Sequence, residues 1–162
     1  MCELVASWSE DESRKVGAVI VGLGNETVGV GFNGLPREID NGPAHRHDKM
    51  SGEKYLWYEH AERNALYNTI RAGGRVVGAT MFSSGFPCAD CARAIIQTGI
   101  SVLKTFKYDL TDPVYSKHFT VAEEMLLEAG VDVQVFDRED LELVKAKLAF
   151  HDLQNPKNNF LR

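Results

Sequence analysis

Two observations predict an α/β fold for this chain, with helices on both faces of a sheet. Short apolar runs bounded by turn residues, typical of buried strands, alternate with longer segments of helical periodicity after a leading hairpin. The chain has 162 residues, of which 44% are hydrophobic and 25% charged, as in an ordinary globular protein. We therefore expect one domain over residues 1–162, with its core at about 15–136.

The first predicted elements are a short helix and a β-hairpin. Apolar residues at helical spacing indicate a helix within residues 1–10. The β-branched run of residues 15–21 and the alternating valine and glycine of residues 27–32 are typical of strands, and Gly24-Asn25 marks a turn between them. The glycines of the second strand suggest that another element packs close to its backbone.

Beyond residue 57 the predicted helices and strands alternate. Glycines mark the expected helix ends, because glycine is favoured just after the last helical turn. The expected helices are 58–72, 90–98, 119–129 and a last one at about 139–150, and the expected strands are 78–83, 100–106 and 131–136.

Charge and hydropathy exclude several classes of protein. The net charge of −5 argues against stable nucleic-acid binding, which usually requires an excess of Lys and Arg. No run of about 18 apolar residues indicates a transmembrane helix, and the N-terminus does not resemble a secretory signal. Of the three cysteines, two are three residues apart, which favours a metal or redox role over a disulfide scaffold. We expect a cytoplasmic protein that does not bind membranes.

The chemistry is concentrated at the starts of two predicted helices, in His60-Ala61-Glu62 and Pro87-Cys88-Ala89-Asp90-Cys91. Cysteines three residues apart at a helix start project to the same side. With one imidazole they form a Cys₂His set, and three ligands leave a fourth position of tetrahedral zinc for water, as in catalytic sites. Such water loses a proton near neutral pH, and Glu62 is placed to carry that proton.

Two other interpretations of the cysteine pair are weaker. A structural zinc ribbon needs a second pair, and Cys2 is the only other cysteine. A thioredoxin-like redox pair leaves the His-Ala-Glu helix start unexplained. The metal interpretation accounts for both segments together.

The two segments match the signature H-x-E…P-C-x-x-C of zinc nucleobase and nucleotide deaminases. From about Lys15 to Val131 the chain resembles the deoxycytidylate (dCMP) deaminase branch of that superfamily. The resemblance rests on residues 15–21, Gly31-Phe32-Asn33-Gly34-Leu35-Pro36, His60-Ala61-Glu62-Arg63-Asn64-Ala65 and residues 87–100.

This resemblance implies a three-layer α/β/α sandwich with a five-stranded mixed sheet, and hydrolysis of dCMP to dUMP and ammonia, supplying thymidylate synthesis. Zinc-hydroxide would attack C4 of the base while Glu62 protonates N3 and then helps ammonia leave. Asn33 would hold the deoxyribose hydroxyl, the backbone N–H of Ala61 would meet the base carbonyl, and Tyr108 would pack against base or sugar.

The resemblance also implies partners and regulation. Family members commonly form homohexamers, and some are switched on by dCTP and off by dTTP, with Mg²⁺ accompanying the regulatory nucleotide. Arg71, near the end of a predicted helix, has two interpretations: contact with an allosteric nucleotide, or the more ordinary role of a cation at a helix C-terminus.

The irregular stretch of residues 33–57 is long enough to be functional. Its cations are expected to include the ligand of a 5′-phosphate, with Arg37 and Lys54 as candidates; alternatively they form a solvated mixture with nearby acidic residues. His45 and His47 could belong to a second metal site, but without a third obvious ligand they are more often solvated. The set of loop cations is Arg37, Arg46, Lys49 and Lys54.

Three other functions are possible for such a centre. The same centre could serve a free nucleoside, a free base or a triphosphate, because the recognition loop decides the substrate. An editing enzyme such as a tRNA adenosine deaminase needs a basic face, which the net charge of −5 disfavours. A non-catalytic zinc-binding scaffold would have no use for Glu62.

Overall fold

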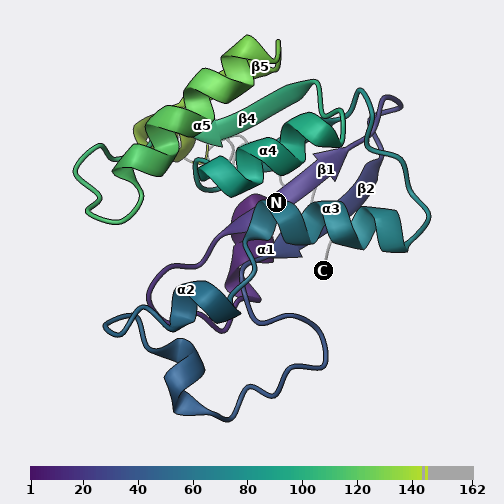
Figure 1. The fold of residues 1–162 in the computed structure, drawn as a ribbon. Coiled ribbons are helices and arrows are strands. Elements are labelled where there is room, and N and C mark those ends of the chain that lie inside the picture. Colours follow the sequence, from purple (N-terminus) through teal and green to yellow (C-terminus); the bar gives the residue numbers. More distant parts are fainter. Residues whose placement is uncertain (144, 146–162) are drawn as a thin grey trace, which may run out of the picture.

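The computed structural model describes residues 1–143 and 145, and these contain a five-stranded mixed sheet (Figure 1). Strand β1 is antiparallel to both its neighbours, β2 and β3, whereas β3, β4 and β5 are parallel. The order across the sheet is β2-β1-β3-β4-β5, which confirms the predicted sheet. The strands are β1 (Gly17–Val21), β2 (Thr27–Phe32), β3 (Thr80–Ser83), β4 (Val102–Phe106) and β5 (Asp132–Phe136).

Helices lie on both faces of this sheet. Three of them, α3 (Ala61–Arg71), α4 (Ala89–Gln97) and α5 (Ser116–Glu128), cover one face, and α1 (Cys2–Ser7) lies behind the sheet in Figure 1. Residues 138–143 and 145 are also helical, and they lie close to α1. The other residues of the helix predicted at 139–150 fall outside the described part of the chain.

Glycines allow the helices to approach the hairpin closely. A Cβ atom on Gly31 would lie 2.2 Å from the backbone nitrogen of Ala65, and one on Gly29 would lie 1.8 Å from the Thr69 hydroxyl, both in α3. On the opposite face, a Cβ on Gly17 would meet the carbonyl oxygen of Cys2 at 2.2 Å. A side chain at any of these three glycine positions therefore could not be accommodated without moving a helix.

The prediction that a helix starts at residue 58 is wrong by about one turn, because α3 begins at Ala61. Residues 58–60 are extended, and Glu59 pairs with Gly34 through two backbone hydrogen bonds of 3.0 and 2.8 Å. This pairing holds the chain out of helical geometry until His60. The preceding stretch is also less irregular than expected, because it contains a 3₁₀ turn, Ala44–His47, and the short helix α2 (Lys54–Trp57).

The topology gathers several chain segments at one edge of the sheet. Because β1 runs opposite to β2 and β3, it begins where they end: Gly17 pairs with Phe32, and Ala18 pairs with Ser83. Strand β4 ends at the same edge, because it is parallel to β3. Helices α3 and α4 both start there, so their unpaired N–H groups face a common space.

A buried ion pair fastens the long connection between β2 and α3 to the N-terminal segment. The Lys54 ammonium lies 2.6 Å from the Asp11 carboxylate, and both side chains are almost fully buried. Burial alone would raise the pKa of Asp11, but hydrogen bonds from Lys54, Ser13 and Arg14 hold that pKa below its usual range.

Within the described part of the chain, no helix is long and apolar enough to span a membrane.

We predict that Gly31→Ala destabilises the protein by about 1–3 kcal/mol, because the added methyl group must push α3 away from β2. The matched control is Gly34→Ala, whose Cβ would meet nothing closer than the Phe32 ring at 3.9 Å. Urea unfolding followed by circular dichroism measures both. Equal stability of the two variants would contradict the close packing of α3 on β2.

We predict that Lys54→Met reduces the loss of stability in acid. The carboxylate of Asp11 stabilises the fold above its unfolded pKa near 3.8, and this contribution is lost as pH falls through the lower folded pKa. Without Lys54 the folded pKa moves back toward 3.8, so the free energy of unfolding should change less between pH 5 and pH 3.5. An unchanged pH dependence, with the exposed Lys117→Met as control, would refute the pair's role.

Candidate metal centre and substrate cleft

His60 occupies the N-cap position of α3, in extended conformation. Its backbone N–H donates to its neighbour Glu59 at 2.9 Å, and the same carboxylate accepts from the Arg63 guanidinium. Arg63 also lies 3.6 Å from Asp90 in the first turn of α4. These contacts hold the backbone at His60 and link the starts of the two helices.

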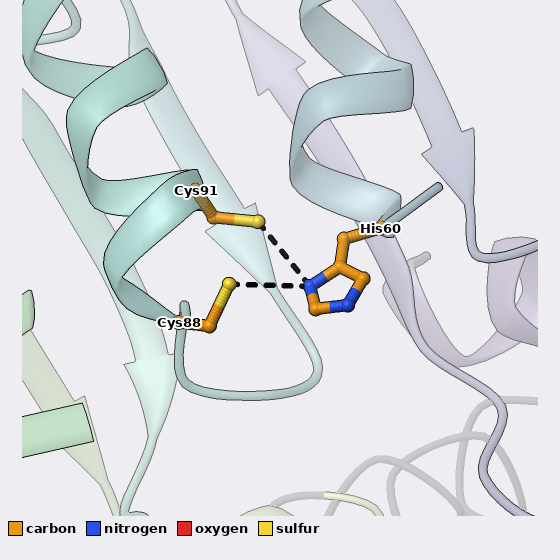
Figure 2. A group of neighbouring side chains, drawn as sticks. All are labelled: His60, Cys88 and Cys91. Carbon is orange, nitrogen blue, oxygen red and sulfur yellow. Dashed lines mark hydrogen bonds between the residues drawn. The ribbon is translucent and has the colours of Figure 1, made fainter. Parts of the chain in front are cut away.

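Cys88 and Cys91 lie at the start of α4, Cys88 at the N-cap and Cys91 in the first turn. Figure 2 shows both sulfurs directed toward the Nδ1 atom of His60, at 3.4 Å from Cys88 and 3.5 Å from Cys91. All three ligand atoms lie within 4.8 Å of one another. Among residues 1–143 and 145, this is the one group of three or more such side chains that could hold a metal ion.

The geometry fits zinc. Tetrahedral angles with zinc–sulfur and zinc–nitrogen bonds of about 2.3 and 2.05 Å place a sulfur and a nitrogen ligand about 3.5 Å apart. The observed sulfur–nitrogen distances are 3.4 and 3.5 Å. A Cys₂His donor set is one that zinc prefers, and it leaves one tetrahedral position for a further ligand.

Contacts among the three side chains shift the pKa of each of them. Hydrogen bonding from the Cys91 thiol, and then from His60, lowers the pKa of Cys88 to about 3. That coupling, together with burial, raises the pKa of Cys91. Burial would lower the pKa of His60, but its contact with Cys88 outweighs burial and raises it. A thiolate at a helix N-terminus next to an imidazole is the form that a metal ion binds.

Glu62 lies beside this group, in the first turn of α3, and is 3% exposed. The Ser83 hydroxyl donates to one carboxylate oxygen at 3.0 Å, and the Cys91 thiol approaches the other at 3.5 Å. Burial is the main reason that its pKa is raised. A carboxyl group with a raised pKa next to a metal-capable cluster is a candidate for both accepting and releasing a proton in general acid–base catalysis.

A cavity of about 260 Å³ opens onto His60, Glu62 and Cys88. Its lining combines an aromatic wall with a basic rim. In the wall the rings of Phe86 and Tyr108 are 4.6 Å apart, and the Tyr108 hydroxyl donates to Glu123 at 2.8 Å. The wall is Phe86, Tyr108, Tyr115 and Phe119, and the rim cations are Arg14, Lys15, Lys107 and Arg138.

The structure brings Asn33, Ala61 and Tyr108 to this cavity, together with Glu62 and two of the candidate ligands, His60 and Cys88. It does not bring Arg37, Lys54 or Arg71 there. Arg37 is exposed and contacts Asn68, and Lys54 is buried against Asp11. Arg71 is the exposed last residue of α3, where it has the position of a helix C-terminal cation.

His45 and His47 are occupied by other contacts. Nδ1 of His47 lies 2.7 Å from the Tyr58 hydroxyl, and Nε2 lies 2.9 Å from the backbone oxygen of Asn41. The His45 ring packs edge-on against Trp57 at 5.8 Å. Both side chains therefore stabilise the connection before α3, and neither takes part in the metal-capable group.

Sequence reasoning missed the rim cations, although a signal for them existed. Lys15 comes two residues before β1, Lys107 directly follows β4, and Arg138 comes two residues after β5. The guanidinium of Arg138 donates to the Ser84 carbonyl at 3.0 Å, so it reaches across the sheet edge. Polar residues that flank strands at one edge of a sheet are candidates for ligand contact.

Comparisons with known proteins agree with this geometry. Residues 1–106 match the family described as "Cytidine and deoxycytidylate deaminase zinc-binding region". The chain is 36% identical over 137 residues to a deoxycytidylate deaminase of Mus musculus, covering 82% of this chain and 74% of the relative. It is 39% identical over 136 residues to an uncharacterized deaminase in the luxG 3′ region of Aliivibrio fischeri, covering 82% and 86%.

A solved structure is also similar. The dCMP deaminase from cyanophage S-TIM5, in complex with dCMP and dUMP, aligns with a TM-score of 0.68 and 26% identity over 83% of this chain and 90% of that chain. Fold, converging side chains and sequence similarity thus agree. The chain belongs to the cytidine and deoxycytidylate deaminase family, whose zinc-binding region its residues 1–106 match.

Proposed function

We propose that this protein hydrolyses dCMP to dUMP and ammonia, using zinc held by His60, Cys88 and Cys91. The observation that carries the proposal is the convergence of these three ligand atoms within 4.8 Å, beside buried Glu62 and at one cavity. Deoxycytidylate deaminases among the relatives support the choice of substrate, as does the similar phage enzyme in complex with dCMP and dUMP.

Two thiolates and a neutral imidazole balance the charge of a zinc dication. When bound, zinc supplies an activated water molecule near neutral pH. His60 would hold the metal through Nδ1, the nitrogen that faces both sulfurs. The contacts of Arg63 with Glu59 and Asp90 would keep the two helix starts at the spacing that the metal requires.

Glu62 moves the protons. Its carboxylate accepts a proton from the attacking water as the new oxygen–carbon bond forms at C4 of the base, and delivers it to N3. Glu62 then takes the remaining water proton from the hydroxyl on C4 and gives it to the exocyclic nitrogen, so the C4–N bond breaks, C4 becomes a carbonyl carbon and ammonia leaves. The Ser83 hydroxyl, which donates to Glu62 at 3.0 Å, orients the carboxyl group for both transfers.

The cavity lining holds the base. Ala61 is the first residue of α3, so its N–H has no acceptor within the helix and can donate to the base carbonyl. Tyr108 packs against base or sugar from the aromatic wall, where its hydrogen bond to Glu123 fixes the ring. Asn33 lies at the end of β2 and contacts the deoxyribose hydroxyl.

The rim cations are better placed than the loop cations to bind a 5′-phosphate. Lys107 and Arg138 line the cavity, whereas Arg37 and Lys54 do not. A buried phosphate dianion needs charged partners, and bonds between charged groups are roughly twice as strong as neutral ones. The rim therefore favours a monophosphate over an uncharged nucleoside.

The remaining expectations stay predictions. They rest on the resemblance to the family: assembly as a homohexamer, activation by dCTP, inhibition by dTTP, Mg²⁺ with the regulatory nucleotide, and an effector contact at Arg71. The expected cytoplasmic location likewise stays a prediction. One domain over residues 1–162 is proposed on the single sheet that the described residues form.

We predict about one zinc per chain in the purified protein, and loss of that zinc in Cys88→Ala, because two ligands bind far more weakly than three. The matched control is Cys2→Ala, which changes the cysteine at the start of α1. The zinc content of both variants is measured by inductively coupled plasma mass spectrometry. Full zinc content in Cys88→Ala would contradict the ligand assignment.

We predict that Glu62→Gln keeps zinc and fold but lowers kcat by at least about 10²–10⁴-fold, because the amide cannot accept the water's proton. The exposed Glu124→Gln serves as the control for removing one negative charge. Ammonia release from dCMP is the assay. A kcat within a few-fold of wild type would reject the proton-carrying role.

We predict a higher kcat/KM for dCMP than for deoxycytidine. Lys107→Glu should lower kcat/KM for dCMP by about 10–100-fold, the loss of one charged hydrogen bond, while any residual deoxycytidine turnover is spared. Arg37→Glu tests the loop assignment in the same assay. Equal values for dCMP and deoxycytidine would replace the monophosphate with a nucleoside, and a loss at Arg37 alone would return the phosphate contact to the loop.

A further inference from the structure

The carboxylate of Asp11 binds three separate parts of the chain, at residues 13–14, 33 and 54. Asp11 does not itself line the cavity that opens onto His60, Glu62 and Cys88. It is 4% exposed and accepts hydrogen bonds from the N–H and hydroxyl of Ser13 at 2.8 Å and from the N–H of Arg14 at 3.2 Å. It also accepts from the side-chain amide of Asn33 at 2.8 Å. The fifth donor is Lys54.

Lys54 is fully engaged by this cluster. Its ammonium lies 2.7 and 2.6 Å from the two carboxylate oxygens of Asp11, contacts the Ser13 hydroxyl and faces the Tyr58 ring at 5.4 Å. An ammonium group has three N–H donors. All three have partners here, so Lys54 acts on the cleft through Asp11.

The same cluster determines which way the Asn33 side chain points. A carboxylate can only accept, so Asp11 selects the NH₂ end of the Asn33 amide, whose second hydrogen goes to the Arg14 carbonyl at 2.8 Å. The oxygen end accepts from the N–H of Val16 at 2.8 Å. Because an amide oxygen has two lone pairs, one acceptor position of Asn33 remains for a ligand in the cavity.

We propose that Asp11, held by its buried ion pair with Lys54, is a positioning residue that fixes Asn33 as a hydrogen-bond acceptor toward the substrate's sugar hydroxyl. This inference rests on the proposed function. It means that the long connection between β2 and α3 contributes to substrate binding through Lys54 and Asp11, without itself touching the substrate.

The test is a double-mutant cycle between Asp11→Asn and Asn33→Ala, with dCMP turnover and zinc content measured for each protein. An asparagine at position 11 carries no charge and can present either end of its amide, so the orientation of Asn33 is then selected only by the Arg14 carbonyl and the Val16 N–H, and is held less firmly. We expect Asp11→Asn to raise KM for dCMP about five- to tenfold, with kcat changed less than about threefold, because the lost contact is remote from the reacting atoms. Zinc content should stay unchanged.

In the Asn33→Ala background the same change at Asp11 should alter KM by less than about twofold, since the residue through which Asp11 acts is gone. Equal effects of Asp11→Asn in both backgrounds, or no effect on KM in the wild-type background, would overturn the proposal. The exposed Glu124→Gln, which removes one negative charge from α5, is the control.

Asp11→Asn leaves the buried Lys54 without a charged partner and can prevent folding. In that event Asp11→Asn/Lys54→Met, which leaves no unpaired charge, takes its place in the cycle with the same expected outcomes. A wild-type protein that releases no ammonia from dCMP would overturn the proposed function instead. Active wild-type protein with additive effects would overturn only the positioning role.

Discussion

The site depends on one packing constraint, the close approach of α3 to β2. Gly29 and Gly31 leave room for the α3 backbone at distances that no side chain would allow. This approach sets the start of α3 at the sheet edge where β2 and β3 end, and there His60 meets the cysteines of α4. The edge pairing between Gly34 and Glu59 completes the constraint, because it delays the helix until His60 is in place.

The electrostatics of the cleft differ from those of the whole molecule. The chain carries a net charge of −5, yet the cavity rim holds four cations, Arg14, Lys15, Lys107 and Arg138. Deeper in the cleft, burial raises the pKa of Glu62. Hydrogen bonds from Cys91 and His60 lower the pKa of the neighbouring Cys88, which favours the thiolate form of Cys88. Adjacent groups with opposite tendencies toward ionisation can hold a metal ion and still pass protons, as acid–base catalysis requires.

The sequence predicted the strands, most helices and the metal-capable group, because those features depend on local pattern. Apolar periodicity located β2 at its observed bounds, and the spacing of Cys88 and Cys91 at a helix start predicted sulfurs on one side. Features that depend on contacts distant along the chain were not predictable. The partner of Lys54 is 43 residues away along the chain, so the sequence alone presents Lys54 as a cation available to a phosphate. The rim cations come from segments that only the strand order brings together.

Everything proposed for the reaction depends on zinc being held by His60, Cys88 and Cys91, with one position left for the reacting water. X-ray absorption spectroscopy at the zinc edge of the purified protein measures this ligand set. We expect about two sulfur ligands at about 2.3 Å, with the remaining nitrogen and oxygen ligands at about 2.0–2.2 Å. Adding dUMP should perturb the nitrogen and oxygen shell and leave the sulfur shell unchanged. Four sulfur ligands, or none, would show that zinc is not held by these three residues.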